Sequence, residues 1–236
     1  MAHQAYIGTE LDTFAHARNW KAYLRALMGP WLHGRVLEVG AGIGATTAAF
    51  RDGAQARWTA LEPDGALAGR LRARVEQLPL PVDVVVGTLS SATFDEPFDC
   101  VLYVDVLEHI EKDAEELQRA ADLLARQGTI VVLSPAHQAL YTAFDRAIGH
   151  FRRYDAAGLR RLTPSGTSLA HLAYVDSAGL LLSAANRILL RSAMPTVRQV
   201  QTWDRWFVPV SRGLDGLVGG RMGKSILAVW QRGGMA

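Results

Sequence analysis

Apolar residues in this chain occur in two kinds of segment that alternate along its length. Short, nearly continuous apolar runs such as "RVLEV" (35–39) are typical of strands buried on both faces of a sheet. The segments between them space apolar residues three or four apart, which indicates amphipathic helices. The pattern predicts strands at residues 35–39, 56–62, 82–87, 98–105, 129–135, 168–175 and 225–231. It predicts helices at residues 14–32, 45–53, 64–78, 110–128 and 155–163, with more helix after residue 175.

Strands that alternate with helices favour one fold class. Parallel strands need crossover connections, and the crossover helices cover both faces of the sheet. We therefore expect an α/β fold with a doubly wound, mostly parallel seven-stranded sheet and helices on both faces. An N-terminal helix and a C-terminal helical lid complete this Rossmann-like architecture.

Two amphipathic segments have well-defined apolar faces. In residues 110–128 one face consists of Ile110, Ala114, Leu117, Ala121 and Leu124. In residues 196–218 two groups lie at helical spacing on either side of Pro209, which is expected to break or bend the helix: Val200, Trp203 and Phe207, then Val210, Leu214 and Leu217. We predict that this second segment closes an apolar pocket together with residues 178–194. A dimer face or a lipid-contacting face is the alternative.

Composition restricts the function classes. The 236 residues are 49% hydrophobic, enough for a folded domain with a sizeable core, and the net charge of +2 argues against nucleic-acid binding. The single cysteine, Cys100, excludes an internal disulfide framework. Residues 1–23 lack the apolar stretch of a signal peptide, and residues 178–195 are too short and too charged to span a membrane. We therefore expect a cytoplasmic protein, a monomer or homodimer, for which peripheral membrane contact stays open.

The segment "VLEVGAGIGA" (36–45) carries the first chemical signal. Gly40, Gly42 and Gly44 follow the first predicted strand directly, where a ligand of a doubly wound sheet approaches the backbone. Glu62, at the end of the second strand, can accept hydrogen bonds from two ribose hydroxyls. Both features also occur in dinucleotide sites. Glu38 argues against a dinucleotide and for a positively charged cofactor, because a carboxylate repels a pyrophosphate and attracts an ammonium or sulfonium.

The pattern Glu38-x-Gly40-x-Gly42-x-Gly44 with Glu62 resembles class I S-adenosylmethionine (SAM)-dependent methyltransferases. The resemblance continues through "FDCVLYVDVLEHI" (98–110) and "LLARQGTIVVLSPAH" (123–137), and "VLEHI" is frequent in small-molecule enzymes of the ubiquinone-biosynthesis type. It implies SAM as cofactor and one domain over residues 1–236: a helical cap (1–34), a cofactor-binding core (35–135), a substrate-side insertion and lid (136–220) and a last strand (221–236). The implied cofactor residues are Glu38, Gly40, Gly42 and Gly44 at the methionine part, Glu62 at the ribose, Asp64, Gly65, Thr88 and Leu89 on the adenosine side, and Asp105 facing the methyl group.

One residue departs from the family pattern. Many relatives have an aspartate after the third-strand glycine, where it contacts the adenine amino group, but this chain has Thr88. The threonine hydroxyl forms a shorter, uncharged hydrogen bond, and Leu89 is expected to pack on the adenine face.

The string "DVLEHI" (105–110) supports three interpretations. His109 is a general base that removes the acceptor's proton, because its intrinsic pKa suits that work. Alternatively, Asp105, Glu108 and His109 resemble the D-x-x-E-H metal site of quinone O-methyltransferases and hold a divalent cation. In the third interpretation the residues are structural, with Glu108 capping the next helix and His109 packing on the sheet.

The stretch "AHQALYTAFDRAIGHFRRY" (136–154) resembles a lineage of the same superfamily with the pattern YxxFDxxxGHxRRY after the fifth strand. It lies over the acceptor mouth, where Tyr141, Phe144 and Tyr154 are expected to line an apolar pocket. Asp145 is expected to pair with Arg152 or Arg153, and Arg153 is also a candidate substrate contact. His150 is a second candidate base. An Asp–Arg–Tyr network that only pins the loop is the alternative.

The resemblance implies transfer of a methyl group from SAM to an oxygen, nitrogen or carbon of a small molecule. The fold also supports other SAM chemistry, cyclisation or elimination of the aminobutyryl chain, because a fold does not dictate a reaction. An RNA or protein substrate gains no support from the charge. The remaining alternative is a non-catalytic SAM-binding partner subunit.

Overall fold

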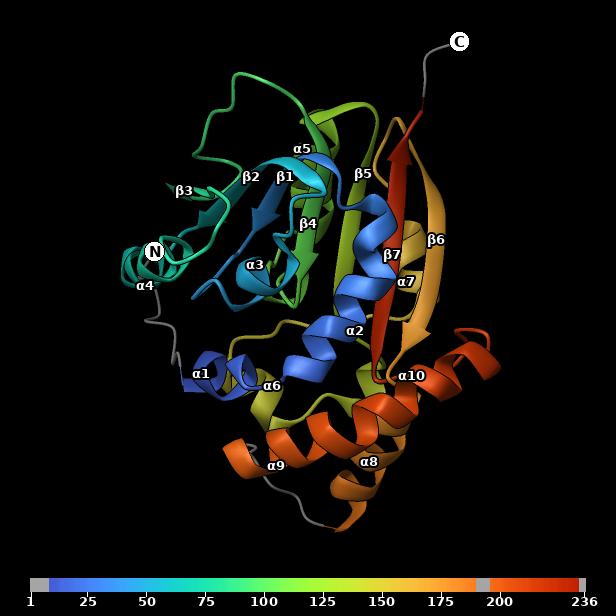
Figure 1. Ribbon diagram of the computed structural model, residues 1–236. Coiled ribbons are helices and arrows are strands. Elements are labelled where there is room, and N and C mark those ends of the chain that lie inside the picture. Colours follow the sequence, from blue (N-terminus) through green and yellow to red (C-terminus); the bar gives the residue numbers. More distant parts are fainter. Residues whose placement is uncertain (1–8, 190–195, 234–236) are drawn as a thin grey trace.

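The computed structural model describes residues 9–189 and 196–233, and its centre is the expected seven-stranded sheet (Figure 1). The strand order is β3-β2-β1-β4-β5-β7-β6, and β7 runs antiparallel to both its neighbours while the other paired strands are parallel. The fold class is therefore confirmed. The strands are β1 (Gly34–Val39), β2 (Gln55–Glu62), β3 (Asp83–Val86), β4 (Phe98–Val104), β5 (Leu124–Pro135), β6 (Thr167–Val175) and β7 (Ser225–Arg232).

The order of the strands defines where a ligand can bind. Strand β1 lies between β2 and β4, so the chain first builds outward on one side of β1 and then returns to build on the other. The connections after β1 and β4 therefore diverge, and in a sheet of this topology the ligand crevice is expected beyond their carboxyl ends. The glycine loop follows β1, and Asp105 follows β4.

An apolar core lies on each face of the sheet, because alternate strand residues point to opposite sides. Val36 of β1 joins one core and Leu37 the other. The first face is covered by α2 (Arg18–Met28), α3 (Ala45–Phe50) and α4 (Gly65–Val75), and the second by α5 (Asp113–Asp122) and α7 (Ala156–Arg161). Trp58 and Trp230 are fully buried, one in each core.

The N-terminal helix expected over residues 14–32 is in fact two helices. Helix α1 (Thr9–Ala15) ends before Ala17, α2 follows, and a 3-10 turn, η1 (Gly29–Trp31), leads into β1. The side chain of Asp204 caps α2 from a distant part of the chain, accepting hydrogen bonds from the backbone N–H of Asn19 at 3.1 Å and of Trp20 at 2.8 Å. Helical periodicity does not show such a break, because the cap comes from tertiary structure.

The helix expected over residues 110–128 is also shorter. Residues Leu107–His109 form a 3-10 turn, η2, and α5 covers only Asp113–Asp122. Leu124 pairs with Phe98 and Thr129 with Cys100, so the residues between them bulge out of the β4–β5 ladder. Of the expected apolar face, Leu117 and Ala121 are buried within the helix, whereas Leu124 belongs to β5.

A helical cap lies at the end of the sheet toward which β4 points (Figure 1). It consists of η3 (Gln138–Leu140), α6 (Ala143–Ala147), α8 (Ser177–Leu189), α9 (Val197–Thr202), a π-helical turn η4 (Trp203–Phe207) and α10 (Val208–Leu217). The wide turn η4 lies directly before Pro209, which confirms that the proline interrupts a regular helix. The described residues contain no helix with the length and apolar character needed to cross a bilayer.

Two buried aspartates attach this cap to the rest of the molecule. Asp215 accepts hydrogen bonds from the Tyr23 hydroxyl at 2.7 Å and from the backbone N–H of Asp176 at 2.7 Å. Asp176 in turn accepts from the Ser211 hydroxyl at 2.6 Å and the Trp203 indole N–H at 3.2 Å. These contacts hold α10 against α2 and the end of β6.

The pocket-closing prediction for the C-terminal helices is only partly met. Val200, Trp203 and Val208 are buried in the core that faces α2. Of the expected second apolar group, Val210 and Leu217 are exposed and Leu214 is half-buried. Residues 190–195, within the predicted wall 178–194, lie outside the described residues.

Candidate functional site

The loop after β1 depends on glycine for both its dihedral angles and its space. The φ angles are +67° at Gly40, +56° at Gly42 and +74° at Gly44, in the left-handed region that disfavours residues with a Cβ. A Cβ at Gly40 would lie 2.7 Å from Val106, and one at Gly44 would lie 2.6 Å from Leu71. Glycine is therefore needed at Gly40 and Gly44 for close packing against Val106 and Leu71, and we call this loop the glycine cradle.

Glu62 ties the glycine loop to the end of β2. Its Oε2 accepts a hydrogen bond from the Gly42 backbone N–H at 2.8 Å, and its Oε1 accepts one from the Asp64 N–H at 2.9 Å. Burial raises the pKa of this carboxyl, although the two N–H groups oppose the rise. Each carboxylate oxygen keeps a second lone pair, so Glu62 can still accept from two ribose hydroxyls.

Glu38 was expected to face a positively charged part of the cofactor, and its carboxylate forms hydrogen bonds with two protein side chains. Its Oε2 accepts hydrogen bonds from the Thr47 hydroxyl at 2.6 Å and the Trp58 indole N–H at 3.0 Å. The side chain is buried between β1, β2 and α3, and burial raises its pKa to about 7, partly offset by these two hydrogen bonds. Glu38 thus holds α3 and its glycine loop against the sheet, and its role as a cofactor residue stays a prediction.

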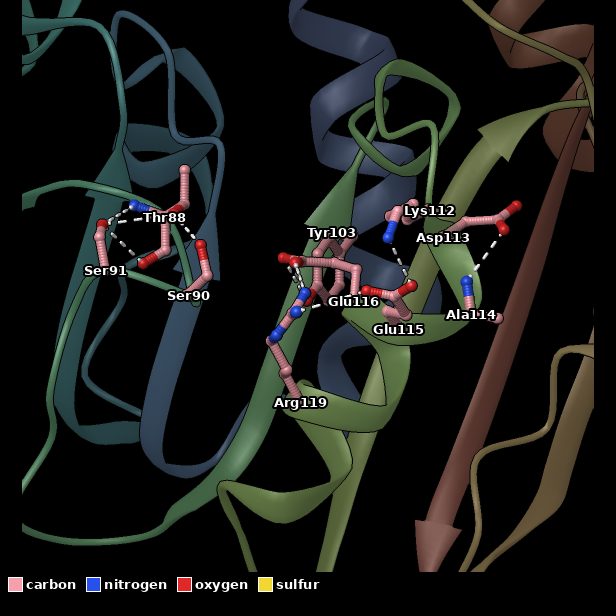
Figure 2. A network of polar contacts seen from close by, with 10 residues as sticks. All are labelled: Thr88, Ser90, Ser91, Tyr103, Lys112, Asp113, Ala114, Glu115, Glu116 and Arg119. Atoms are coloured by element: carbon pink, nitrogen blue, oxygen red, sulfur yellow. Dashed lines mark hydrogen bonds and ion pairs between the residues drawn. The ribbon is translucent and has the colours of Figure 1, made fainter.

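The expected adenosine contacts are mostly engaged in local structure. Asp64 caps α4, because its Oδ1 accepts from the N–H groups of Ala66 and Leu67. The Thr88 hydroxyl lies 2.8 Å from that of Ser90, and Ser91 lies on its other side (Figure 2). Leu89 is buried in the core that contains Tyr103 of β4, and its packing on an adenine ring stays a prediction. Gly65 is exposed, with no atom close to the position a Cβ would take.

Asp105 marks the carboxyl end of β4 and has a strained backbone. Its φ of +54° is unusual for a residue with a side chain and typical of functional sites. The side chain is reachable by water, but the surrounding protein desolvates it and raises its pKa. Positive charge on His150, Lys224, Lys21 and Arg153 counteracts that rise. Asp105 therefore lies between the glycine loop on one side of the crevice and the insertion after β5 on the other.

Two of these cationic residues were not expected from the sequence. Lys21 lies in the middle of α2, and Lys224 directly precedes β7, so neither belongs to a motif. Burial lowers the pKa of Lys21 to about 8, although Asp204 and Asp105 oppose the change, and its Nζ donates to the Phe14 carbonyl at 2.7 Å. The sequence signal for Lys21 is weak: it is a lysine on the otherwise apolar inner face of a helix.

The two candidate bases lie side by side. The rings of His109 and His150 are in edge-to-face contact, with centroids 4.5 Å apart. Burial lowers the pKa of His109 to about 4, and positive charge on His150 lowers it further. Glu108 lies behind them, fully buried, with its Oε1 3.8 Å from His150 Nε2 and its Oε2 accepting from the Ser134 hydroxyl at 3.0 Å.

Asp145 organises the insertion after β5. Its carboxylate accepts two hydrogen bonds from the Arg153 guanidinium, at 2.8 Å from Nε and 3.0 Å from Nη2, and lies 3.1 Å from His150 Nδ1. Asp145 therefore pairs with Arg153, one of the two expected partners, whereas Arg152 forms an ion pair with Asp113. Arg153 Nη1 is buried without a hydrogen-bond partner among the described residues, so the role of Arg153 as a substrate contact stays a prediction.

The three expected aromatic residues do not share one role. Tyr154 is buried and donates its hydroxyl to Asp113 at 2.9 Å, so it belongs to the core and does not line a pocket. Tyr141 is half-buried and donates to the His150 carbonyl at 2.6 Å. Phe144 is half-buried in α6. Tyr141 and Phe144 thus remain available to an apolar acceptor next to His150.

One group of side chains has the composition of a metal site. Ligand atoms of Glu108, His109 and His150 all lie within 4.8 Å of one another. The expected set contained Asp105 in place of His150, so the structure changes its third member. Glu108 Oε1 is buried and has no hydrogen-bond partner among the described residues.

Comparison with known proteins gives a consistent result. Residues 36–128 match the family described as a methyltransferase domain, and no curated protein matches the chain. A chain of the complex between the Haloferax volcanii Trm112 methyltransferase activator and a methyltransferase is 19% identical over 98% of this chain and 97% of its own length, with a TM-score of 0.66. The N-methyltransferase NodS from Bradyrhizobium japonicum WM9 is 16% identical over 93% and 97%, with a TM-score of 0.59. NodS is also known in complex with S-adenosyl-L-homocysteine.

Proposed function

We propose that this chain, whose residues 36–128 belong to the methyltransferase domain family and whose fold is that of class I SAM-dependent methyltransferases, methylates an oxygen or nitrogen atom of a small molecule. The observation that carries the proposal is the contact between Asp145 and His150 at the acceptor side of the crevice. A histidine held by a carboxylate through one ring nitrogen is the usual arrangement of a general base.

The cofactor side of the site fits SAM. The glycine cradle after β1 would receive the methionine part, and Glu62 would accept from the ribose hydroxyls. When bound, SAM supplies an electrophilic methyl carbon attached to a sulfonium. Glu38 and Thr47 keep the cradle in place from below, since their hydrogen bond joins the end of β1 to α3.

His150 is a better candidate base than His109. A base works best when its pKa lies near the working pH, and burial lowers the pKa of His109 to about 4. The Nδ1 of His150 faces Asp145, which leaves Nε2 to accept the acceptor's proton. Glu108 Oε1, at 3.8 Å from that nitrogen, is beyond hydrogen-bond distance and leaves it available.

The acceptor is expected to be largely apolar next to the reacting atom. Tyr141 and Phe144 are half-buried on the insertion that also carries His150, and α1 closes the crevice from the opposite side, with Leu11 3.4 Å from the position of a Cβ on Gly42. We place the acceptor between this insertion and α1, where contacts from both sides would align it with the methyl group.

The proposed function is tested by incubating the purified protein with SAM and a metabolite extract, followed by mass spectrometry. We expect S-adenosylhomocysteine and one metabolite heavier by a methyl group. Formation of methylthioadenosine would instead indicate cyclisation or elimination. Binding of SAM without turnover would indicate a non-catalytic subunit, unless addition of a Trm112-type activator, the partner of the Haloferax volcanii relative, restores activity.

A further inference from the structure

The outer surface of the C-terminal helices carries a stripe of apolar side chains. Trp206, Val210 and Leu217 are 63%, 51% and 84% exposed. All three lie on the helical segment formed by η4 and α10. Trp203, Val208 and Ser211 of the same segment are buried. The segment therefore exposes apolar side chains that do not face the core.

The charges on the same segment are strongly asymmetric. Residues 196–222, all of which the structure describes, contain two carboxylates, Asp204 and Asp215. Both are buried: Asp204 caps α2, and Asp215 accepts from Tyr23. The basic residues of the segment are all exposed, and they are Arg198, Arg205, Arg212 and Arg221. The outward surface thus combines four positive charges and no negative charge with exposed apolar side chains.

We propose that this surface, which we call the cap face and define by Trp206, Val210, Leu217 and the four arginines, docks on an anionic lipid bilayer. An interfacial helix buries its apolar side at the level of the headgroups and places arginines next to anionic lipids. Tryptophan is favoured at that level, and here the Arg205 guanidinium lies over the Trp206 ring at 5.3 Å from its centroid.

Charge complementarity distinguishes a bilayer from a second copy of the chain. In a symmetric dimer the same surface occurs on both subunits, so four arginines would face four arginines without a carboxylate from the cap face to pair with them. An anionic membrane supplies the missing negative charge. Exposed Leu181 and Leu182 on the neighbouring helix α8 add apolar area beside the cap face.

The cap face is also connected to the functional site. The inner side of the same helical segment carries Trp203, whose ring packs on Trp20 and lies 5.3 Å from the Lys224 ammonium. Lys224 is one of the charges that act on Asp105. The cap lies at the end of the sheet toward which β4 points (Figure 1), so docking would bring the crevice close to the bilayer surface.

The proposal is tested by flotation of the full-length protein with two kinds of vesicle. One contains phosphatidylglycerol and phosphatidylcholine, and the other contains phosphatidylcholine alone. We expect the protein to bind the anionic vesicles and to be released by salt, which screens the arginines. Trp206→Ala should lower the partition coefficient roughly tenfold through the loss of apolar burial. The double variant Arg205→Gln/Arg212→Gln should lower it about 25-fold, since each arginine near an anionic surface contributes about fivefold.

Matched controls keep the test specific. Val86→Ala removes an exposed apolar side chain from the edge strand β3, and Arg126→Gln/Arg160→Gln removes two exposed charges elsewhere. These variants should bind vesicles as the unchanged protein does. Equal binding to both kinds of vesicle, no binding to either, or equal losses in the control variants would overturn the proposal. A dimer in sedimentation velocity that Trp206→Ala converts to a monomer would assign the cap face to a second copy instead.

Discussion

The Nδ1 atom of His150 lies 3.1 Å from Oδ1 of Asp145, and with this contact the other ring nitrogen, Nε2, lies 3.8 Å from Glu108 Oε1. Burial alone would raise the pKa of Asp145, but hydrogen bonds from His150 and Arg153 outweigh it and hold the pKa below its usual value. Asp145 is therefore ionised at neutral pH, and its carboxylate can only accept a hydrogen bond, so His150 Nδ1 is the donor in this contact.

Replacing His150 tests the base directly. His150→Ala should lower the methylation rate by roughly 10²–10⁴-fold and leave SAM affinity nearly unchanged, because the imidazole acts on the acceptor's proton. His109→Ala is the matched control from the neighbouring ring and should have a much smaller effect. Single-turnover rates and calorimetric titration with SAM measure the two quantities. The opposite ranking of the two variants would assign the base to His109.

Asp145→Asn separates a positioning role from a purely structural one. The asparagine keeps the shape but loses the charge that orients His150, so the rate should fall and its pH profile should shift. Asp145 has a lowered pKa, so its stabilising contribution is present above the unfolded-state pKa and is lost as pH falls below about 4. The check is to measure the methylation rate at several pH values and, as a second readout, the unfolding curve of the variant. A loss of stability with an unchanged pH–rate profile would leave Asp145 only pinning the loop.

Glu62→Ala should weaken SAM binding by about 2–4 kcal/mol, because charge-assisted hydrogen bonds to the ribose are lost. Calorimetric titration measures this loss. The same carboxylate holds Gly42 and Asp64, so the control is a thermal melt without ligand, which separates loosening of the loop from loss of the ligand contact. Unchanged affinity would remove Glu62 from the cofactor site.

Glu38→Gln tests the buried carboxyl beneath the glycine loop. Burial raises the folded-state pKa of Glu38 to about 7, above its ordinary value of 4.5. The stabilising contribution of a group with a raised pKa is full below the unfolded-state pKa and is lost as pH rises through the folded-state pKa. The variant should therefore gain up to about 3 kcal/mol relative to the unchanged protein between pH ~4.5 and pH ~7.5. Urea unfolding of both proteins at these two pH values is the measurement, and a constant difference would contradict the assignment.

Chelation tests the alternative role of the cluster of Glu108, His109 and His150. Burial raises the pKa of Glu108 well above its usual value, which favours the neutral carboxyl over the carboxylate that a divalent cation needs. We therefore expect methyl transfer to survive dialysis against a strong chelator. Loss of activity that added Mg²⁺ or Zn²⁺ restores would establish a metal site instead.

The fold followed from local patterns in the sequence. Short apolar runs and the helices between them repeat over a few residues, so the strands and most helices could be placed before their packing was known. The predicted bounds of helices were wrong where a residue far away in the sequence determines them. Leu124 satisfies a helical spacing but pairs with Phe98 in the sheet, and α2 begins where Asp204 supplies its cap.

The candidate site also has a part that the sequence predicts and a part that only the tertiary structure determines. Gly40, Gly42, Gly44 and Glu62 could be recognised along the chain because their spacing reflects a loop of local geometry. The approach of His150 to Glu108, the direction of the Glu38 carboxylate toward Trp58, and the burial of Asp204 and Asp215 beneath exposed arginines depend on contacts between residues far apart in sequence. No periodicity encodes such contacts, because they arise only when the helices pack on the sheet and each buried polar group must find its partner.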